Sequence, residues 1–245
     1  MLLAARGSVA PRIKLDMHMH TQYSRDSRSS LEAFARRATE AGLGAVCVTD
    51  HDTAAGGLRL AKMDVPFTVV SGEEVTTRDG EVVGLFLERD VPRGLSAEET
   101  AKRIRGQGGL VYIPHPFSRN RLRHLREPVL DRLVEQGLVD AIEIFNAREI
   151  TAASNARAVA FAVQHGLPGG VGSDAHRLAE IGRAYIEVAH FATPSELLAA
   201  LREGTIAGKL SGVVVHLRTW SDIGRKVVRR AASALRSGTT PEQRP

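Results

Sequence analysis

The chain has 245 residues, of which 43% are hydrophobic, and a net charge of +5. This length and the mixed strand and helix patterns favour one domain around a single sizeable core. No apolar run approaches the roughly 20 residues of a membrane span, so we expect a cytoplasmic protein without a membrane partner. The single cysteine excludes an intrachain disulfide, and the apolar neighbours of Cys47 predict a small buried side chain.

The positive charge is concentrated at one end of the chain. Residues 218–245 contain seven basic and two acidic residues, which accounts for the whole net charge. Apolar residues between Ile223 and Leu235 follow helical spacing, with basic residues between them. We therefore predict one domain over 1–217, then a basic C-terminal helix and a disordered tail over 218–245. A solvated helix face is the simpler interpretation of the charge, and a contact with nucleic acid or lipid is the alternative.

Strand and helix patterns alternate along the chain. The first strand is predicted over 13–19 and the first helix over about 30–41, with Gly42 at its end. Ser96 and Thr193 each begin a capping box, with a Glu three residues later. A turn at Arg78-Asp79-Gly80 predicts that the strands on both sides of it form a hairpin. Further strands are predicted over 45–49, 67–74, 82–87, 110–113, 141–145, 169–173 and 185–188.

Repeated strand and helix units favour a parallel sheet covered by helices. The number of units suits a closed barrel better than a small open sheet. An open doubly wound sheet would favour a Gly-x-Gly-x-x-Gly or Walker loop after the first strand, and the sequence has neither there. We therefore predict an α/β barrel, in which side chains at the carboxyl ends of the strands converge on one rim. The open sheet is the alternative.

The first predicted strand ends in two histidines that share one face. Because residues i and i+2 of a strand point the same way, Asp16, His18 and His20 line one side of it. Histidine and carboxylate that gather at successive strand ends predict a metal site. Four histidines lie outside the clusters that make up this pattern, and we interpret them as surface or core residues: His124, His165, His190 and His216. Three more clusters close apolar runs that predict strands: Thr49-Asp50-His51-Asp52, Pro114-His115-Pro116 and Ser173-Asp174-Ala175-His176.

These motifs, in this order, resemble those of the PHP (polymerase and histidinol phosphatase) family of metal-dependent phosphoesterases. The resemblance covers residues 13–217. It implies an α/β fold of a particular kind, a distorted seven-stranded (β/α)7 barrel. It also implies two or three divalent metal ions, usually zinc, manganese or iron, at the carboxyl ends of the strands. Members of the family hydrolyse phosphomonoesters or short nucleic acids, and some are domains of bacterial replicative DNA polymerases.

The resemblance also assigns the metal ligands of this chain. One ion would take His18, His20 and Asp174. Glu74 would bridge this ion to a second ion on His115. Asp26, His51 and His176 would bind a third ion. The predicted ligand set is therefore His18, His20, Asp26, His51, Glu74, His115, Asp174 and His176.

At three positions near these ligands, the sequence leaves open which residue binds the metal. The Gly-x-Glu spacing of the family selects Glu74 over Glu73, since neighbouring strand residues face opposite sides. The stretch 137–146 lacks the His that many relatives use for the second ion, so Asn146 or water would complete that shell. Glu81 stands where some relatives have a His. It is either a metal ligand or an exposed turn residue, and we leave it outside the predicted ligand set.

Two or three divalent ions close together would activate a water and hold phosphate oxygens. We therefore predict hydrolysis of phosphate esters, with a metal-bound hydroxide as the attacking group. Asp16 and Asp52 flank the ligands, and we predict that they orient imidazoles or accept a proton. No arrangement of Ser, His and Asp or of Cys and His competes with this site in the sequence.

A phosphate substrate needs cationic groups near the ions. Of the three arginines that follow His115-Pro116, Arg119 is placed first, ahead of Arg121 and Arg123. Asn146 and Arg148 are the other predicted substrate-binding residues.

Three function classes are consistent with the sequence. A hydrolase of a small phosphorylated metabolite or nucleotide is favoured. An exonuclease or oligoribonuclease on short nucleic acid is the alternative, which the basic C-terminal segment would serve, although only 4% of residues are aromatic and could stack on bases. A non-catalytic PHP module is disfavoured because the four motifs are complete. The sequence does not specify the ester, the metal or the oligomeric state.

Overall fold

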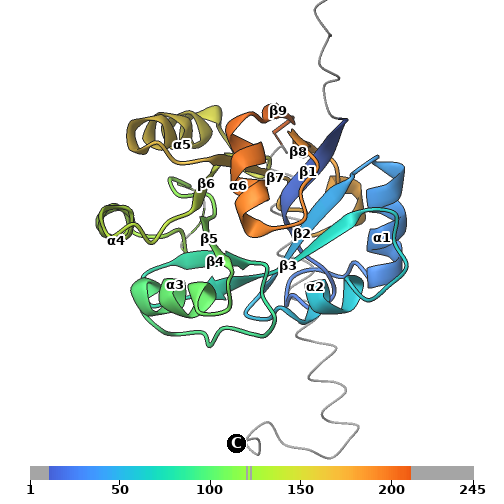
Figure 1. The fold of residues 1–245 in the computed structure, drawn as a ribbon, viewed down its shortest axis with the longest axis horizontal. Helices are drawn as coiled ribbons and strands as arrows, with labels where there is room; N and C mark the ends of the chain where they lie inside the picture. Colours follow the sequence, from blue (N-terminus) through green and yellow to red (C-terminus); the bar gives the residue numbers. More distant parts are fainter. Residues whose placement is uncertain (1–10, 120, 122, 211–245) are drawn as a thin grey trace, which may run out of the picture.

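The computed structural model describes residues 11–119, 121 and 123–210. Helices surround one curved sheet (Figure 1). Within the described residues this sheet has nine strands in the order β7-β6-β5-β4-β3-β2-β1-β8-β9. The strands are β1 (Arg12–Met19), β2 (Ala45–His51), β3 (Thr68–Thr76), β4 (Glu81–Leu85), β5 (Leu110–Ile113), β6 (Ala141–Asn146), β7 (Gly169–Gly172), β8 (Ala184–Ala189) and β9 (Thr205–Gly208). The helices are α1 (Leu31–Glu40), α2 (Ala55–Leu60), α3 (Ala97–Arg105), α4 (Glu127–Glu135), α5 (Ala152–His165) and α6 (Pro194–Arg202), with a 3-10 turn η1 (Leu178–Glu180).

Strands β1 to β7 curve into a nearly closed barrel. The closure lies at the carboxyl end of β1, where Met19 forms a parallel bridge with Ala175, just after β7. There His20 N donates to Ala175 O at 2.9 Å, and Asp174 N donates to His18 O at 2.7 Å. The amino-terminal part of β1 pairs antiparallel with β8, which pairs in turn with β9. The predicted α/β barrel is confirmed, and the sheet of the described residues has nine strands where seven were expected.

One strand of the barrel is reversed. β3 and β4 form the predicted antiparallel hairpin, in which Thr76 pairs with Glu81. β4 also pairs antiparallel with β5, which the sequence analysis did not predict. The other barrel neighbours, β1 with β2, β2 with β3, β5 with β6 and β6 with β7, are parallel. Because β4 alone is reversed among β1 to β7, the other six strands present their carboxyl ends at the same rim.

Local hydrogen bonds begin the helices where the sequence predicts them. Ser30 Oγ accepts a backbone N–H at the start of α1. Ser96 with Glu99, at the start of α3, and Thr193 with Glu196, at the start of α6, form the predicted capping boxes. Each cap satisfies N–H groups that the first turn of a helix leaves without partners. The caps therefore fix where each helix leaves the loop above its strand.

Three apolar clusters join the helices to the sheet. The first joins the strands to α6 and includes Leu15, Tyr112 and Leu197. The second packs α3, α4 and α5 against β4, β5 and β6, and the third packs α1 and α2 against β1 and β2. Cys47 lies fully buried in the first cluster, as predicted. The apolar core thus lies along the strands and beneath the helices, and it leaves the strand ends to polar side chains.

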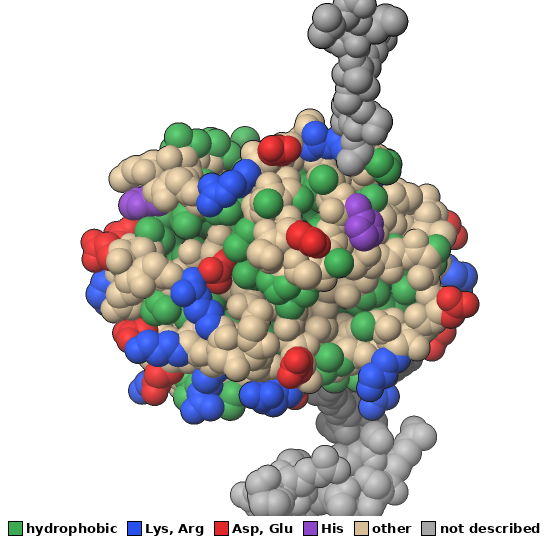
Figure 2. Space-filling model, viewed as in Figure 1, with side chains coloured by type: hydrophobic (Ala, Val, Ile, Leu, Met, Phe, Trp, Pro, Cys, Tyr) green, Lys and Arg blue, Asp and Glu red, His purple; other side chains and the backbone are tan. Residues whose placement is uncertain are grey.

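Acidic and basic side chains are interspersed over the face of the molecule in Figure 2. Among the helices of the described residues, none combines the length and the apolar character that crossing a bilayer needs. The predicted basic helix and tail over 218–245 lie outside the described residues.

Candidate metal centre

Five strands deliver the eight predicted ligands to one place at the carboxyl rim of the barrel, and we call these eight residues the rim cluster. Seven of them are buried, and the side chain of His51 is 8% exposed. Each lies at a strand end or in the loop that follows it: His18 and His20 at β1, Asp26 in the loop after β1, His51 at β2, Glu74 at β3, His115 after β5, and Asp174 and His176 after β7.

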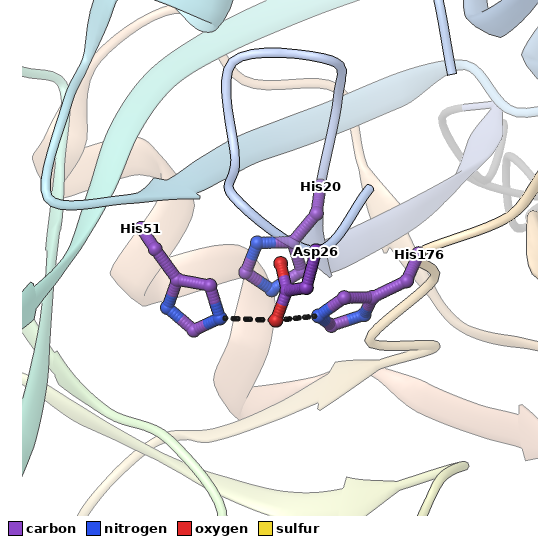
Figure 3. A group of neighbouring side chains, drawn as sticks. All are labelled: His20, Asp26, His51 and His176. Carbon is purple, nitrogen blue, oxygen red and sulfur yellow. Dashed lines mark ion pairs between the residues drawn. The ribbon is translucent and has the colours of Figure 1, made fainter. Parts of the chain in front are cut away.

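One part of the rim cluster gathers four side chains around a common point (Figure 3). Potential ligand atoms of His20, Asp26, His51 and His176 all lie within 4.8 Å of one another. Asp26 Oδ2 is 3.2 Å from His51 Nε2 and 3.2 Å from His176 Nε2, the two contacts drawn as dashed lines in Figure 3. Ser24 supports them, since its Oγ is 3.0 Å from His20 Nδ1 and accepts the His51 N–H at 2.9 Å. Three imidazoles and a carboxylate form a donor set for a transition metal.

A second part lies where the two histidines of β1 face two carboxylates. Glu74 Oε2 is 3.4 Å from His18 Nε2 and 3.5 Å from His20 Nε2. Asp174 Oδ1 is 3.9 Å from His18 Nε2 and 3.5 Å from His20 Nε2. Strand alternation thus places both imidazoles on the same side of β1.

Glu74 extends the cluster to β4 and β5. Its Oε1 is 2.9 Å from His115 Nε2, and its Oε2 is 3.1 Å from His51 Nδ1. Glu81 is 4% exposed, and its Oε2 is 3.9 Å from His115 Nε2. The sequence analysis left Glu81 outside the ligand set, but His51, Glu74 and Glu81 form a further group of closely spaced donors. The reason is the hairpin register, which places Glu81 opposite Thr76 and therefore on the same face as Glu74.

Four ligand atoms at the centre of the cluster have no hydrogen-bond partner within the described part of the chain. They are His18 Nε2, His20 Nε2, Glu74 Oε2 and Asp174 Oδ1. A buried polar atom without a partner costs about 1–3 kcal/mol, so such atoms rarely face one another without a bound group. Imidazole nitrogen and carboxylate oxygen are donors that zinc, manganese and iron accept. The residues therefore fit divalent metal ions.

Burial and neighbouring charge shift the pKa values of these groups in both directions. Burial opposes protonation of His18 and His51, but neighbouring carboxylates raise the pKa of His18 well above its ordinary value and that of His51 to about 9. Burial opposes ionisation of Glu74, but two neighbouring histidines hold the pKa of its carboxyl well below its ordinary value. Burial also opposes ionisation of Asp174, and Arg121 is the main charge that holds its pKa well below the ordinary range. Burial and two neighbouring histidines hold the pKa of His20 well below its ordinary value. Glu74 and Asp174 are thus ionised and His20 is neutral at pH 7.

Glu143, which the sequence analysis missed, lies directly behind the cluster. It is 1% exposed in β6, and its Oε1 is 3.2 Å from His18 Nδ1. Its Oε2 accepts the His115 N–H at 2.7 Å and the Asn146 Nδ2–H at 2.9 Å. Asn146 Nδ2 is also 3.1 Å from Asp174 Oδ2, so the structure places this predicted substrate-binding residue against the cluster. A single carboxylate among the apolar residues of a predicted strand was the available signal.

Asp16 and Asp52 hold strand ends beside the cluster. Asp16 Oδ1 accepts the N–H of Ser173 at 2.9 Å and of His18 at 3.3 Å, which ties β1 to the end of β7. Burial raises the pKa of the Asp16 carboxyl to about 7. Asp52 Oδ1 accepts the N–H of Thr76 at 2.8 Å and joins the ends of β2 and β3. The action of either carboxylate on an imidazole stays a prediction.

Two guanidinium groups lie against the cluster. Arg121 forms an ion pair with Asp174, whereas Arg119 is exposed. Arg148 is 4% exposed, and its guanidinium contacts His176 Nδ1. Of the predicted arginines, the structure thus brings Arg148 to the site, and it brings Arg121 there in place of the favoured Arg119.

Two residues of the rim cluster have backbone angles that non-glycine residues rarely adopt. His115 has a φ of 30° and Asp174 has a φ of 52°. Such conformations cost about 1–3 kcal/mol each and are concentrated at functional sites.

Comparison with known proteins agrees with this geometry. A family model described as the PHP domain matches residues 16–108, and a PHP-associated model matches residues 152–206. The chain is 38% identical over 147 residues to the uncharacterized protein MJ1587 of Methanocaldococcus jannaschii, an alignment of 55% of this chain and 82% of that protein. It is 35% identical over 179 residues to MJ0417 of the same organism, an alignment of 71% of this chain and 70% of that protein.

The fold also has a solved counterpart in a two-domain protein of Bacteroides vulgatus, which is described as containing a predicted PHP-like metal-dependent phosphoesterase. The TM-score is 0.65 at 18% identity, over 82% of this chain and 66% of that one. Identity at this level supports the fold alone. The PHP-domain match, however, includes His18, His20 and Glu74 of the rim cluster. With these matches and two relatives above 30% identity, the chain belongs to the PHP family.

Proposed function

We propose that this protein is a metal-dependent phosphoesterase that hydrolyses a small phosphorylated metabolite or nucleotide. One observation carries the proposal. Four atoms of His18, His20, Glu74 and Asp174, which have no hydrogen-bond partner among the residues that the structure describes, face one another in a buried site at the barrel rim. Membership of a family of metal-dependent phosphoesterases supports hydrolysis, and the guanidinium groups beside the cluster support a phosphate substrate.

The rim cluster would hold two or three divalent ions of zinc, manganese or iron. Glu74 would contact two of them, because its Oε1 faces His115 while its Oε2 faces His18 and His20. Glu81 is a further candidate ligand near His115. When bound, the ions supply Lewis-acid chemistry that makes water a stronger nucleophile and neutralises charge on a phosphate ester.

The side chains of the protein position and stabilise the ester. Arg121 and Arg148 offer guanidinium groups, which bind phosphate oxygens in a bidentate geometry. The carboxylates of Glu74 and Asp174 remain ionised, so their negative charge would stabilise cations bound in the site. Because the cluster is buried, water screens these charges less than it would at the surface. Arg119 remains a proposed substrate-binding residue.

The test is metal analysis combined with a substrate panel. Elemental analysis of the purified protein should find at least two transition-metal equivalents. With manganese present, the panel should include nucleotides, nucleoside bisphosphates, sugar phosphates and short oligonucleotides. We expect hydrolysis of a small phosphate ester, its loss on chelation and its return when manganese is added again.

Other outcomes would contradict the proposal in different ways. A metal-free protein with full activity would remove the metal from the mechanism. Hydrolysis confined to oligonucleotides would favour a nuclease. A metal-loaded protein that hydrolyses nothing in the panel would favour a non-catalytic module.

A further inference from the structure

We infer that Glu143 is a positioning residue, which holds His18 in the tautomer whose Nε2 can bind a metal ion. The inference rests on the proposed function, since it assigns a role toward the ions of that site. Glu143 lies in β6 and approaches His18 from the side of the ring opposite to Glu74. The Nδ1 of His18 is 3.2 Å from Glu143 Oε1, and the Nε2 is 3.4 Å from Glu74 Oε2.

The two nitrogens of the His18 ring therefore have different surroundings. An ionised Glu143 carboxylate has acceptors and no donor. In a hydrogen bond with it, the Nδ1 of His18 must therefore carry the proton. A neutral imidazole with a proton on Nδ1 has its lone pair on Nε2. That Nε2 has no hydrogen-bond partner within the described residues. Carboxylates that fix metal-binding histidines in this way recur in metal sites.

Glu143 also contacts two other donors, which explains why a carboxylate is needed there. Its Oε2 accepts the backbone N–H of His115 at 2.7 Å and the side-chain N–H of Asn146 at 2.9 Å. Asn146 in turn donates to Asp174 Oδ2 at 3.1 Å. One buried side chain thus receives hydrogen bonds from three directions, and only a group with acceptors alone satisfies all three.

The neighbouring strand leaves room for this arrangement. A Cβ atom on Gly172 of β7 would overlap both Glu143 Oε1 and the Cβ of His18. Glycine at position 172 therefore permits the close approach of β1, β6 and β7 behind the metal site.

An amide at position 143 would reverse the tautomer. In Glu143→Gln, the amide oxygen can accept from His115 and Asn146, which turns the amide NH₂ toward His18. The Nδ1 of His18 must then accept a hydrogen bond, and its proton moves to Nε2. The opposite amide orientation sets the NH₂ against two donors and is less favourable. In the favoured orientation the variant keeps nearly the same shape and loses a correctly prepared ligand.

The test compares zinc binding by the wild-type chain, by Glu143→Gln and by a matched control. Glu73→Gln is the control because Glu73 is also buried and accepts one backbone N–H, from Val91 at 2.7 Å. In competition with a chromophoric chelator, we expect Glu143→Gln to weaken zinc binding at least about tenfold. The control should bind zinc as the wild type does, and circular dichroism should show both variants folded.

Nitrogen NMR of the zinc-loaded, histidine-labelled wild type gives a second readout, which does not depend on whether Glu143→Gln folds. We expect His18 to carry a proton on Nδ1 and to bind zinc through Nε2, with the signal assigned by its loss in His18→Ala. Zinc binding through Nδ1, or wild-type affinity in Glu143→Gln, would overturn the inference. A wild type that binds zinc through His18 Nε2 and hydrolyses no phosphate ester would contradict the proposed function and support the inference.

Discussion

His18 contributes to the candidate metal centre and does not contribute to the apolar core. Its ring nitrogens face Glu143 on one side and Glu74 on the other. The apolar packing of β1 comes instead from Leu15 and Met17, on the opposite face of the strand. Substitution of the ring should therefore affect the chemistry of the rim far more than the stability of the barrel.

We expect His18→Ala to lower phosphoesterase activity by at least about 100-fold, because it removes a ligand from the central group of donors. Initial rates with manganese, together with circular dichroism, measure the loss of activity and the retention of fold. Asp174→Ala should behave in the same way. His165→Ala, at an exposed position of α5, is the control and should keep normal rates. Near-normal turnover by His18→Ala would contradict the ligand assignment.

Glu74 and Glu73 are neighbours with opposite roles. Glu74 contacts His115 and His18, whereas the Glu73 carboxylate accepts the Val91 N–H outside the rim cluster. We therefore expect Glu74→Gln to lower the hydrolysis rate by at least about 100-fold and Glu73→Gln to have a mild effect. Rates of the two purified variants on one substrate decide the matter, and the reverse order would show that Glu73 is the ligand.

Glu73 should also make the stability of the metal-free protein depend on pH. Burial raises the pKa of its carboxyl from the ordinary 4.5 to about 8. Between these values the folded chain keeps a proton that the unfolded chain releases, so the free energy of unfolding falls as pH rises and levels off above about 8. Urea unfolding across this range, with a chelator present, measures the slope. Glu73→Gln should have a smaller slope, and equal slopes would rule out this source.

The residue types of the site were predictable, but some contacts were not. Strand alternation was enough to set His18 and His20 on one face of β1. Arg121 reaches Asp174 through a loop whose path local sequence does not specify. The partners of Glu143 come from β1 and β5, and only the folded barrel brings those strands together.

Among the elements, those governed by local chemistry followed the sequence. The capping boxes of α3 and α6 form as predicted, and the Asp79-Gly80 turn joins β3 to β4. The directions of β5 and β8 relative to their neighbouring strands were not predicted from the sequence. β8 pairs with the amino-terminal part of β1, a partner far away in the chain. β9 has only four residues, and two of them, Thr205 and Gly208, are not apolar. Its hydrophobic pattern therefore did not predict a strand.

Strand β7 offers a test of how closely the elements pack behind the site. We expect Gly172→Ala to cost about 1–3 kcal/mol of unfolding free energy and to weaken metal binding, because the added Cβ meets Glu143 and His18. Urea unfolding and zinc titration measure the two effects.

Gly166, at the end of α5, is the matched control. It has a φ of 63° and open space where a Cβ would lie. Gly166→Ala should therefore lower stability by about 1 kcal/mol through its backbone conformation alone and leave zinc affinity unchanged. Equal zinc affinity in both variants would show that Gly172 does not support the site.

For the molecule as a whole, the choice between a small substrate and nucleic acid depends on the basic segment beyond the described residues. If the substrate is small, neutralising Arg225, Lys226, Arg229 and Arg230 should leave kcat/KM for a mononucleotide nearly unchanged, with weak salt dependence. For a nuclease that uses this segment, oligonucleotide affinity would fall with salt by a log–log slope of about −0.7 per phosphate contacted. A steep slope in the wild type that the variant loses would favour the nuclease.

The bridge between Met19 and Ala175 sets when the site can exist during folding. His20 and Asp174 meet only once the two ends of the barrel have joined. Loop-closure entropy opposes contacts between distant parts of a chain, so we expect this joining to come after the local hairpin and helices have formed. We therefore expect metal ions to bind the finished barrel and not the collapsed chain. We expect bound ions to lengthen the lifetime of the native state by slowing its unfolding and to leave the folding rate of new chains unchanged.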